Sequence, residues 1–116
     1  MKKKFAFFAF NGAPLCFMHV LLNALDMQEK GFEVKVIFEG GTVKLIDEFS
    51  KPDNPFHSLY KRAKNAGLID CVCKACAVKM ESLNAAESES LPINGELSGH
   101  PAMARYIEEG YEILLF

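Results

Sequence analysis

The run KFAFFAF at residues 4–10 restricts the fold more than any other part of the chain. A strand with one solvent-exposed face alternates apolar and polar residues, whereas nearly every side chain in this run is apolar. We therefore expect a central strand that is covered on both faces of a sheet. The turn residues NGAP at 11–14 follow, and an apolar helix over 15–30 then ends at Gly31. The chain thus begins with a strand, a turn and a helix.

The same kinds of elements follow along the chain. Residues 32–40 (FEVKVIFEG) alternate apolar side chains with Glu33 and Lys35, which predicts a strand that meets water near a sheet edge. The later expected elements are a helix at 42–50, an interruption between Pro52 and Pro55, a helix at 56–66, a strand at 68–72, a helix from about Lys74, a polar stretch at 84–95, a helix from Pro101 to Gly110, and a buried strand at 111–116.

Strands that alternate with helices predict right-handed crossovers and a mainly parallel sheet with helices on both faces. The 116 residues, half of them apolar, are enough for one core and too few for two ordinary domains. We therefore predict a single α/β domain over residues 1–116, with three α/β/α layers around a mainly parallel sheet.

Charge and hydropathy exclude some classes of partner. The chain has 13 basic and 15 acidic residues, a net charge of −2, so it has no strong field to attract a nucleic-acid backbone. The start MKKKFAFFAF imitates a secretory signal, but NGAP interrupts its apolar run, and no apolar run reaches the roughly 18 residues of a membrane span. We expect a cytoplasmic protein with reduced thiols and no membrane partner.

Three of the four cysteines lie within CVCKAC at residues 71–76. In a strand, Cys71 and Cys73 point to the same side at about 6.5–7 Å, which is a poor start for a disulfide. Cys73 at the strand end and Cys76 in the first helical turn form a thiol pair at a helix N-terminus, where free N–H groups and the charge of Lys74 favour thiolate. We interpret Cys73 and Cys76 as the reactive pair, and Cys71 and Cys16 as packed thiols.

Other candidate residues lie at the same rim of the predicted sheet. Ligands of open parallel sheets bind beyond the carboxyl ends of the strands. Asn11, Gly12 and Ala13 follow the first strand, and their backbone is either an anion- or sulfur-binding surface or a simple tight turn. His100 precedes Pro101 and is explained by the start of the last helix, although a His100 folded back toward Cys73 would serve as an acid or base.

The chain resembles the DsrE/DsrF-like family, which includes sulfur-relay subunits of the TusD type. The resemblance rests on KKKFAFFAF, EKGFEVKVIFEG, GLIDCVC and GHPAMARYIEEGYEILLF. It implies a doubly wound sheet, a homo-oligomer (a trimer, dimer or hexamer), and a strand-end cysteine that carries a persulfide between sulfur donor and acceptor proteins. The matching position is Cys73, six residues after Gly67. Cys71 and Cys76 go beyond the minimal pattern of the family.

Three hypotheses for function remain open. The leading one is a sulfurtransferase-like carrier that needs no cofactor, in which Cys73 takes sulfur from a donor and Cys76 resolves the persulfide. The alternative is a zinc or other soft-metal site formed by Cys71, Cys73 and Cys76, with a ligand from a neighbouring subunit. The third is an oligomeric small-molecule-binding scaffold in which the thiols are incidental.

Overall fold

The computed structural model describes residues 2–116, which contain one five-stranded sheet in the order β4-β3-β2-β1-β5. Every neighbouring pair of strands is parallel, which confirms the predicted α/β class. The strands are β1 (Lys4–Ala9), β2 (Glu33–Phe38), β3 (Ile69–Cys73), β4 (Ile93–Asn94) and β5 (Glu112–Leu115).

Helices connect the strands at the positions that the glycines and prolines predict. The break around Pro52 and Pro55 separates two helices, as expected. The helix that contains Cys76 begins at Lys74, also as expected. The helices are α1 (Pro14–Glu29), the 3₁₀ helix η1 (Gly40–Lys44), α2 (Leu45–Phe49), α3 (His57–Asn65), α4 (Lys74–Lys79), α5 (Leu83–Ser88) and α6 (Met103–Glu108). Across residues 2–116, no helix has both the length and the apolarity that a bilayer crossing requires.

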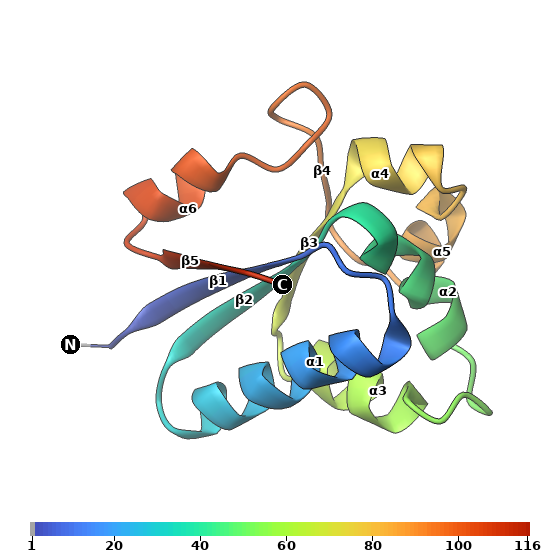
Figure 1. The fold of residues 1–116 in the computed structure, drawn as a ribbon, viewed down its shortest axis with the longest axis horizontal. Coiled ribbons are helices and arrows are strands. Elements are labelled where there is room, and N and C mark those ends of the chain that lie inside the picture. Colours follow the sequence, from blue (N-terminus) through green and yellow to red (C-terminus); the bar gives the residue numbers. More distant parts are fainter. Residues whose placement is uncertain (1) are drawn as a thin grey trace.

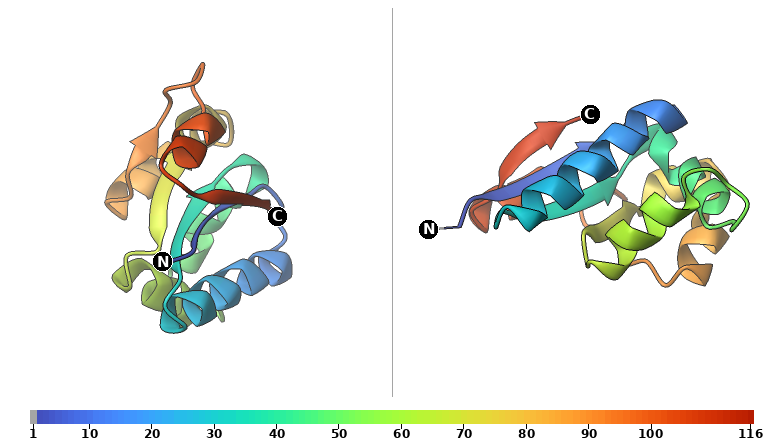
Figure 2. Two further views of the ribbon diagram at one scale, coloured as in Figure 1. Left: turned by 90° about the vertical axis from the view of Figure 1, so that its left-hand side faces the viewer. Right: turned by 90° about the horizontal axis from the view of Figure 1, so that it is seen from below.

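The sheet separates two helical layers, as Figure 1 shows with α6 on one side and α1 with α3 on the other. The turned views in Figure 2 show the same layers, with α1 running along the sheet. The residues of β1 divide between two cores: Phe7 and Ala9 pack toward α1, while Ala6 and Phe8 pack with Tyr106 of α6. The apolar character of both faces of this strand is thus explained, and the three-layer arrangement is confirmed.

Strand β2 lies in the middle of the sheet, so its expected place near an edge is wrong. Part of the strand does meet water, since the Lys35 side chain is 30% exposed. Its polar residues face the α6 layer, which is a single short helix and leaves room for charged groups. The Lys35 ammonium lies 3.7 Å from the Asp70 carboxylate, and the Tyr111 hydroxyl donates to the Glu33 carboxylate. Alternation along this strand therefore marks a thinly covered face rather than an edge.

The last strand also differs from expectation. β5 is an edge strand and not a buried one, with Leu115 64% exposed. Helix α1 buries a face that contains Phe17 and Leu21, while Leu15 and Leu22 remain exposed. The polar stretch at 84–95 contributes most of α5 and all of β4, which its composition did not indicate.

Candidate functional site

Four side chains that can bind metal or exchange protons meet at the carboxyl ends of the parallel strands. Glu39 directly follows β2, Cys73 ends β3, Cys76 lies on α4, and His100 lies on the loop after β4. One ligand atom from each lies within 4.8 Å of the other three. Because parallel strands end at a common rim, three separate crossovers deliver these groups to one place. We call this group of four residues the rim cluster.

Cys73 is the most deeply placed thiol of the cluster, with no exposed surface. It keeps an extended backbone, with φ −64° and ψ 120°, and caps the N-terminus of α4. Its Sγ lies 3.1 Å from His100 Nδ1 and 3.7 Å from the carbonyl oxygen of Gly99. The structure therefore pairs the predicted cysteine with an imidazole that lies 27 residues further along the chain.

The electrostatics of Cys73 differ from the sequence-based expectation of a thiolate. Burial raises the pKa of the Cys73 thiol, and the carboxylate of Glu39 adds to this rise, while the backbone N–H of Cys76 acts in the opposite direction. Helix α4 is only six residues long, and Lys74 is exposed to solvent, so neither offsets the burial. The resting side chain is therefore a thiol, and its reaction as a nucleophile requires a base.

His100 reaches Cys73 because its loop docks on the start of α4. Leu97 and His100 exchange backbone hydrogen bonds of 2.7 and 2.8 Å, and the N–H of Gly99 donates to Gly95 at 3.0 Å. The carbonyl of Gly99 accepts from the N–H of Ala75 at 2.8 Å. Gly99 has a φ of +94°, and a Cβ there would lie 3.0 Å from that of Ala75. A glycine at this position thus permits the close docking that carries His100.

Glu39 is the member of the cluster that sequence reasoning missed. It is only 5% exposed, and its backbone is fixed by a 2.9 Å bond from its N–H to Ala9 and a 2.7 Å bond from the Thr42 hydroxyl to its carbonyl. Its Oε1 lies 3.6 Å from His100 Nδ1 and 3.8 Å from Cys76 Sγ. An acidic residue directly after an apolar strand, at the same rim as Cys73, was the available signal.

The loop at residues 11–13 has a local structural explanation. Asn11 Oδ1 accepts from the N–H of Ala13 at 2.9 Å, which forms a tight turn. A Cβ on Gly12 would lie 2.6 Å from the carbonyl oxygen of Gly41, so this glycine allows the loop to pack against the segment that follows Glu39. Binding by Asn11, Gly12, Ala13 and Lys74 stays a prediction.

The other two cysteines lie apart from the rim cluster. Cys71 is 3% exposed and its Sγ lies 3.4 Å from the Tyr106 hydroxyl, which confirms a packed thiol. Cys16 is exposed, so the interpretation of a packed thiol is wrong there, because the buried face of α1 is rotated away from it. Glu39 and His100, rather than Cys71, accompany Cys73 and Cys76.

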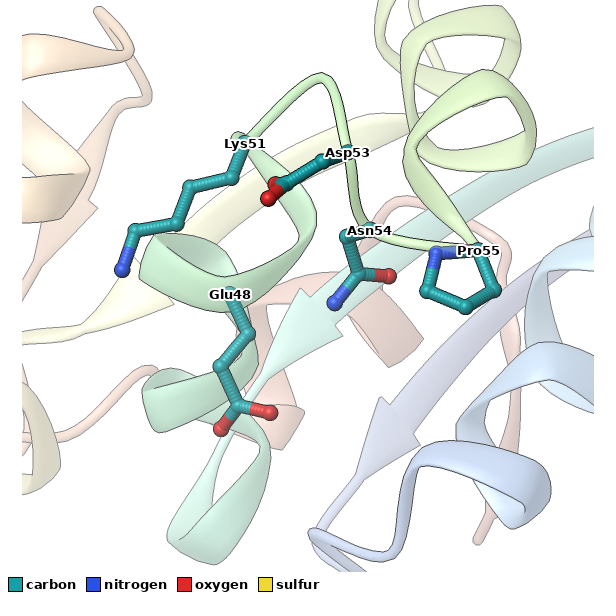
Figure 3. A pocket seen from close by; sticks show the side chains of 5 residues that line it. All are labelled: Glu48, Lys51, Asp53, Asn54 and Pro55. Atoms are coloured by element: carbon teal, nitrogen blue, oxygen red, sulfur yellow. The ribbon is translucent and has the colours of Figure 1, made fainter.

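Two hollows on the surface contain none of these residues. One, of about 230 Å³, lies between α1 and α3 and is lined by Leu25, Gln28, Glu29 and Arg62. The other, of about 280 Å³, surrounds the loop after α2, and Figure 3 shows its lining side chains Glu48, Lys51, Asp53, Asn54 and Pro55. The charged ends of Lys51 and Glu48 point in different directions, so this hollow lacks the convergent polar groups of a binding site.

Comparison with known proteins matches a sequence model of the DsrE/DsrF-like family to residues 6–116. An uncharacterized protein of Methanocaldococcus jannaschii is 33% identical over 97 residues, which cover 84% of this chain and 77% of that protein. An uncharacterized protein of Archaeoglobus fulgidus is 57% identical over 37 residues, which cover 32% of this chain and 100% of that protein. A conserved protein of unknown function from Bacteroides thetaiotaomicron shares the fold, with a TM-score of 0.68, 15% identity, and coverage of 96% of this chain and 94% of that one.

Proposed function

We propose a sulfur-relay function for this chain, which belongs to the DsrE/DsrF-like family. Its Cys73 carries sulfane sulfur as a persulfide between a donor and an acceptor protein. The observation that carries the proposal is the 3.1 Å contact between Cys73 Sγ and His100 Nδ1. This contact gives a buried thiol the neighbouring base that its chemistry needs, at the strand end where the family resemblance also places the sulfur carrier.

Loading begins with transfer of the Cys73 thiol proton to His100 Nδ1. The resulting thiolate attacks the outer sulfur of a donor persulfide, so that a bond forms between the Cys73 sulfur and the sulfane sulfur while the S–S bond of the donor breaks. The donor leaves as a thiolate and takes up the proton from His100. The products are a donor thiol and a persulfide on Cys73, with no net oxidation or reduction.

Two routes remove the sulfane sulfur from Cys73. In relay, an acceptor thiol gives its proton to His100 and its thiolate attacks the outer sulfur, so that the S–S bond of the persulfide breaks and Cys73 leaves as a thiolate that takes the proton from His100. In resolution, the Cys76 thiolate attacks the inner sulfur, which forms a Cys73–Cys76 disulfide and releases hydrogen sulfide. The Sγ atoms of the two cysteines belong to the rim cluster, with ligand atoms within 4.8 Å of one another. After resolution, a thiol reductant of the cytoplasm must reduce the disulfide before Cys73 can accept sulfur again, whereas relay restores the Cys73 thiol directly.

Assembly into a homo-oligomer belongs to the same proposal. Edge strand β5 carries Leu115, which is 64% exposed, and the adjoining Phe116 and Phe10 are each 41% exposed. The backbone N–H of Phe10 donates to Phe116 at 2.6 Å, so these apolar side chains lie close together at the sheet edge. A second copy packed on this edge would remove them from water and cover an exposed strand.

The test is mass spectrometry of chelator-treated, non-reduced protein after exposure to a low-molecular-weight persulfide. We expect added sulfur on the peptide that contains Cys73, and none at this position in Cys73→Ser. Cys16→Ser is the matched control, because Cys16 is exposed and lies outside the rim cluster. It should load sulfur at Cys73 like the wild type. Exclusive loading of Cys16 in the wild type, with Cys73 unmodified, would contradict the proposal.

A further inference from the structure

We infer that the rim cluster is also a binding site for one zinc ion, held by Glu39, Cys73, Cys76 and His100. The ligand types support this assignment. Two thiols, an imidazole and a carboxylate are the groups that zinc uses in proteins, and the sulfur donors disfavour the hard ions magnesium and calcium. This set differs from the three-cysteine site that the sequence suggested, because Cys71 packs against Tyr106 instead.

The spacing of the four side chains supports a tetrahedral ion. Zinc bonds of about 2.3 Å to sulfur and roughly 2.0–2.2 Å to nitrogen and oxygen place tetrahedral ligand atoms about 3.4–3.8 Å apart. The measured separations are 3.1 Å for Cys73–His100, 3.6 Å for His100–Glu39 and 3.8 Å for Cys76–Glu39. The other three separations are at most 4.8 Å. A tetrahedral arrangement therefore requires each separation to change by no more than about 1 Å.

Charge gives a second, independent reason. The side chain of Glu39 is only 7% exposed, and within residues 2–116 its one basic partner closer than 4 Å is His100. Buried carboxylates in proteins are paired with a cation or coordinate a metal. When zinc binds, the two thiol protons leave for solvent, so one dication replaces two protons and the net charge of the site is unchanged. The ion nevertheless bonds directly to the Glu39 carboxylate, and it thus gives this buried group the metal partner that such groups take in proteins.

The ion has a route of entry and a consequence for function. The His100 side chain is 46% exposed, so the imidazole forms the solvent side of the site while Glu39 forms its floor. With four protein ligands the coordination is closed, as in structural sites, and leaves no position for substrate. Bound zinc then masks the sulfur of Cys73. This masking role, unlike the binding itself, rests on the proposed sulfur-relay function.

The test is titration of reduced, metal-free protein with Co²⁺, followed by displacement with Zn²⁺. We expect one Co²⁺ per chain, with the visible bands of tetrahedral cobalt and a thiolate-to-cobalt charge-transfer band, and full displacement by one Zn²⁺. Cys76→Ser and Glu39→Gln should each weaken zinc binding by more than about 10- to 100-fold, since changes even outside the ligand shell cost that much. Cys71→Ser and His19→Ala should bind as the wild type does.

Two results would overturn the site: no charge-transfer band at stoichiometric Co²⁺, or unchanged affinity in Cys76→Ser. Thermal unfolding of each metal-free variant, compared with the wild type, separates loss of a ligand from loss of the fold. Sulfur loading is measured in parallel on zinc-free and zinc-loaded protein. Cobalt binding without sulfur on Cys73 supports the metal site and removes the relay, whereas sulfur loading without cobalt binding does the reverse. Loading that zinc abolishes supports both.

Discussion

Removal of the His100 imidazole is expected to slow sulfur uptake at Cys73 by roughly 100-fold or more, because positioned general bases contribute about 10²–10⁴-fold. The distance of 3.1 Å from Cys73 Sγ to His100 Nδ1 is within direct reach for proton transfer. Burial raises the pKa of the thiol, so the thiolate is scarce without a base.

The assay is the rate of sulfur addition to the Cys73 peptide, followed by quenched mass spectrometry with a small persulfide donor and a chelator present. His100→Asn keeps a polar side chain near the position of Nδ1 but removes the base, whereas His100→Ala also opens the site. Both should be slow, and His19→Ala, an exposed change on α1, should react at the wild-type rate. If both His100 variants load sulfur as fast as the wild type, the imidazole is not the base and the reasoning fails.

Three further predictions concern the scaffold. Gly12→Ala should lower the free energy of unfolding by about 1–3 kcal/mol, because its Cβ would lie 2.6 Å from a backbone carbonyl; an unchanged urea midpoint would show that the loop can move. Burial raises the pKa of Glu89, but hydrogen bonds from the Tyr60 hydroxyl and a lysine outweigh this and hold the pKa below its ordinary 4.5. At pH 7 the wild type should therefore have a larger free energy of unfolding than Glu89→Gln. This difference should disappear as the pH is lowered through the folded-state pKa of Glu89, which urea unfolding at several pH values would measure. A difference that does not change with pH would contradict an ionic origin. Leu115→Glu should reduce the oligomer mass in light scattering, whereas Ile107→Glu, 58% exposed on α6, should not; equal masses for Leu115→Glu and wild type would exclude the β5 edge as the interface.

The sequence predicted those parts of the fold and site that depend on local signals. The doubly apolar run at 4–10, the glycine at 31 and the motif at 71–76 each determine a strand, a helix end or a strand-to-helix junction through neighbouring residues. For the same reason Cys73 and Cys76 could be placed next to each other at the strand-to-helix junction. Their spacing places them together whatever the remainder of the chain does.

The parts of the fold and site that local signals do not determine depend on contacts between residues far apart in the chain. Glu39 lies 37 residues from Cys76, and its role follows only from the order in which the strands pair. His100 lies on a loop that is held by backbone hydrogen bonds, and such bonds can be made by almost any residue type, so the sequence does not reveal them. Strand β4 has two residues and is stabilised by pairing with β3 rather than by its own composition. Propensity cannot detect such tertiary effects.

The residues of the rim cluster come from three separate parts of the chain, and this determines when, during folding, Cys73 comes into contact with Glu39 and His100. During synthesis, residues 71–76 emerge well before His100, and the His100 loop cannot dock until α4 has formed on the folded sheet. Contacts between residues far apart in sequence form late, because closing their loops costs chain entropy. Until then the cysteines behave as ordinary, unassisted thiols. Under the proposed function, the rate of sulfur uptake at Cys73 would therefore report completion of folding.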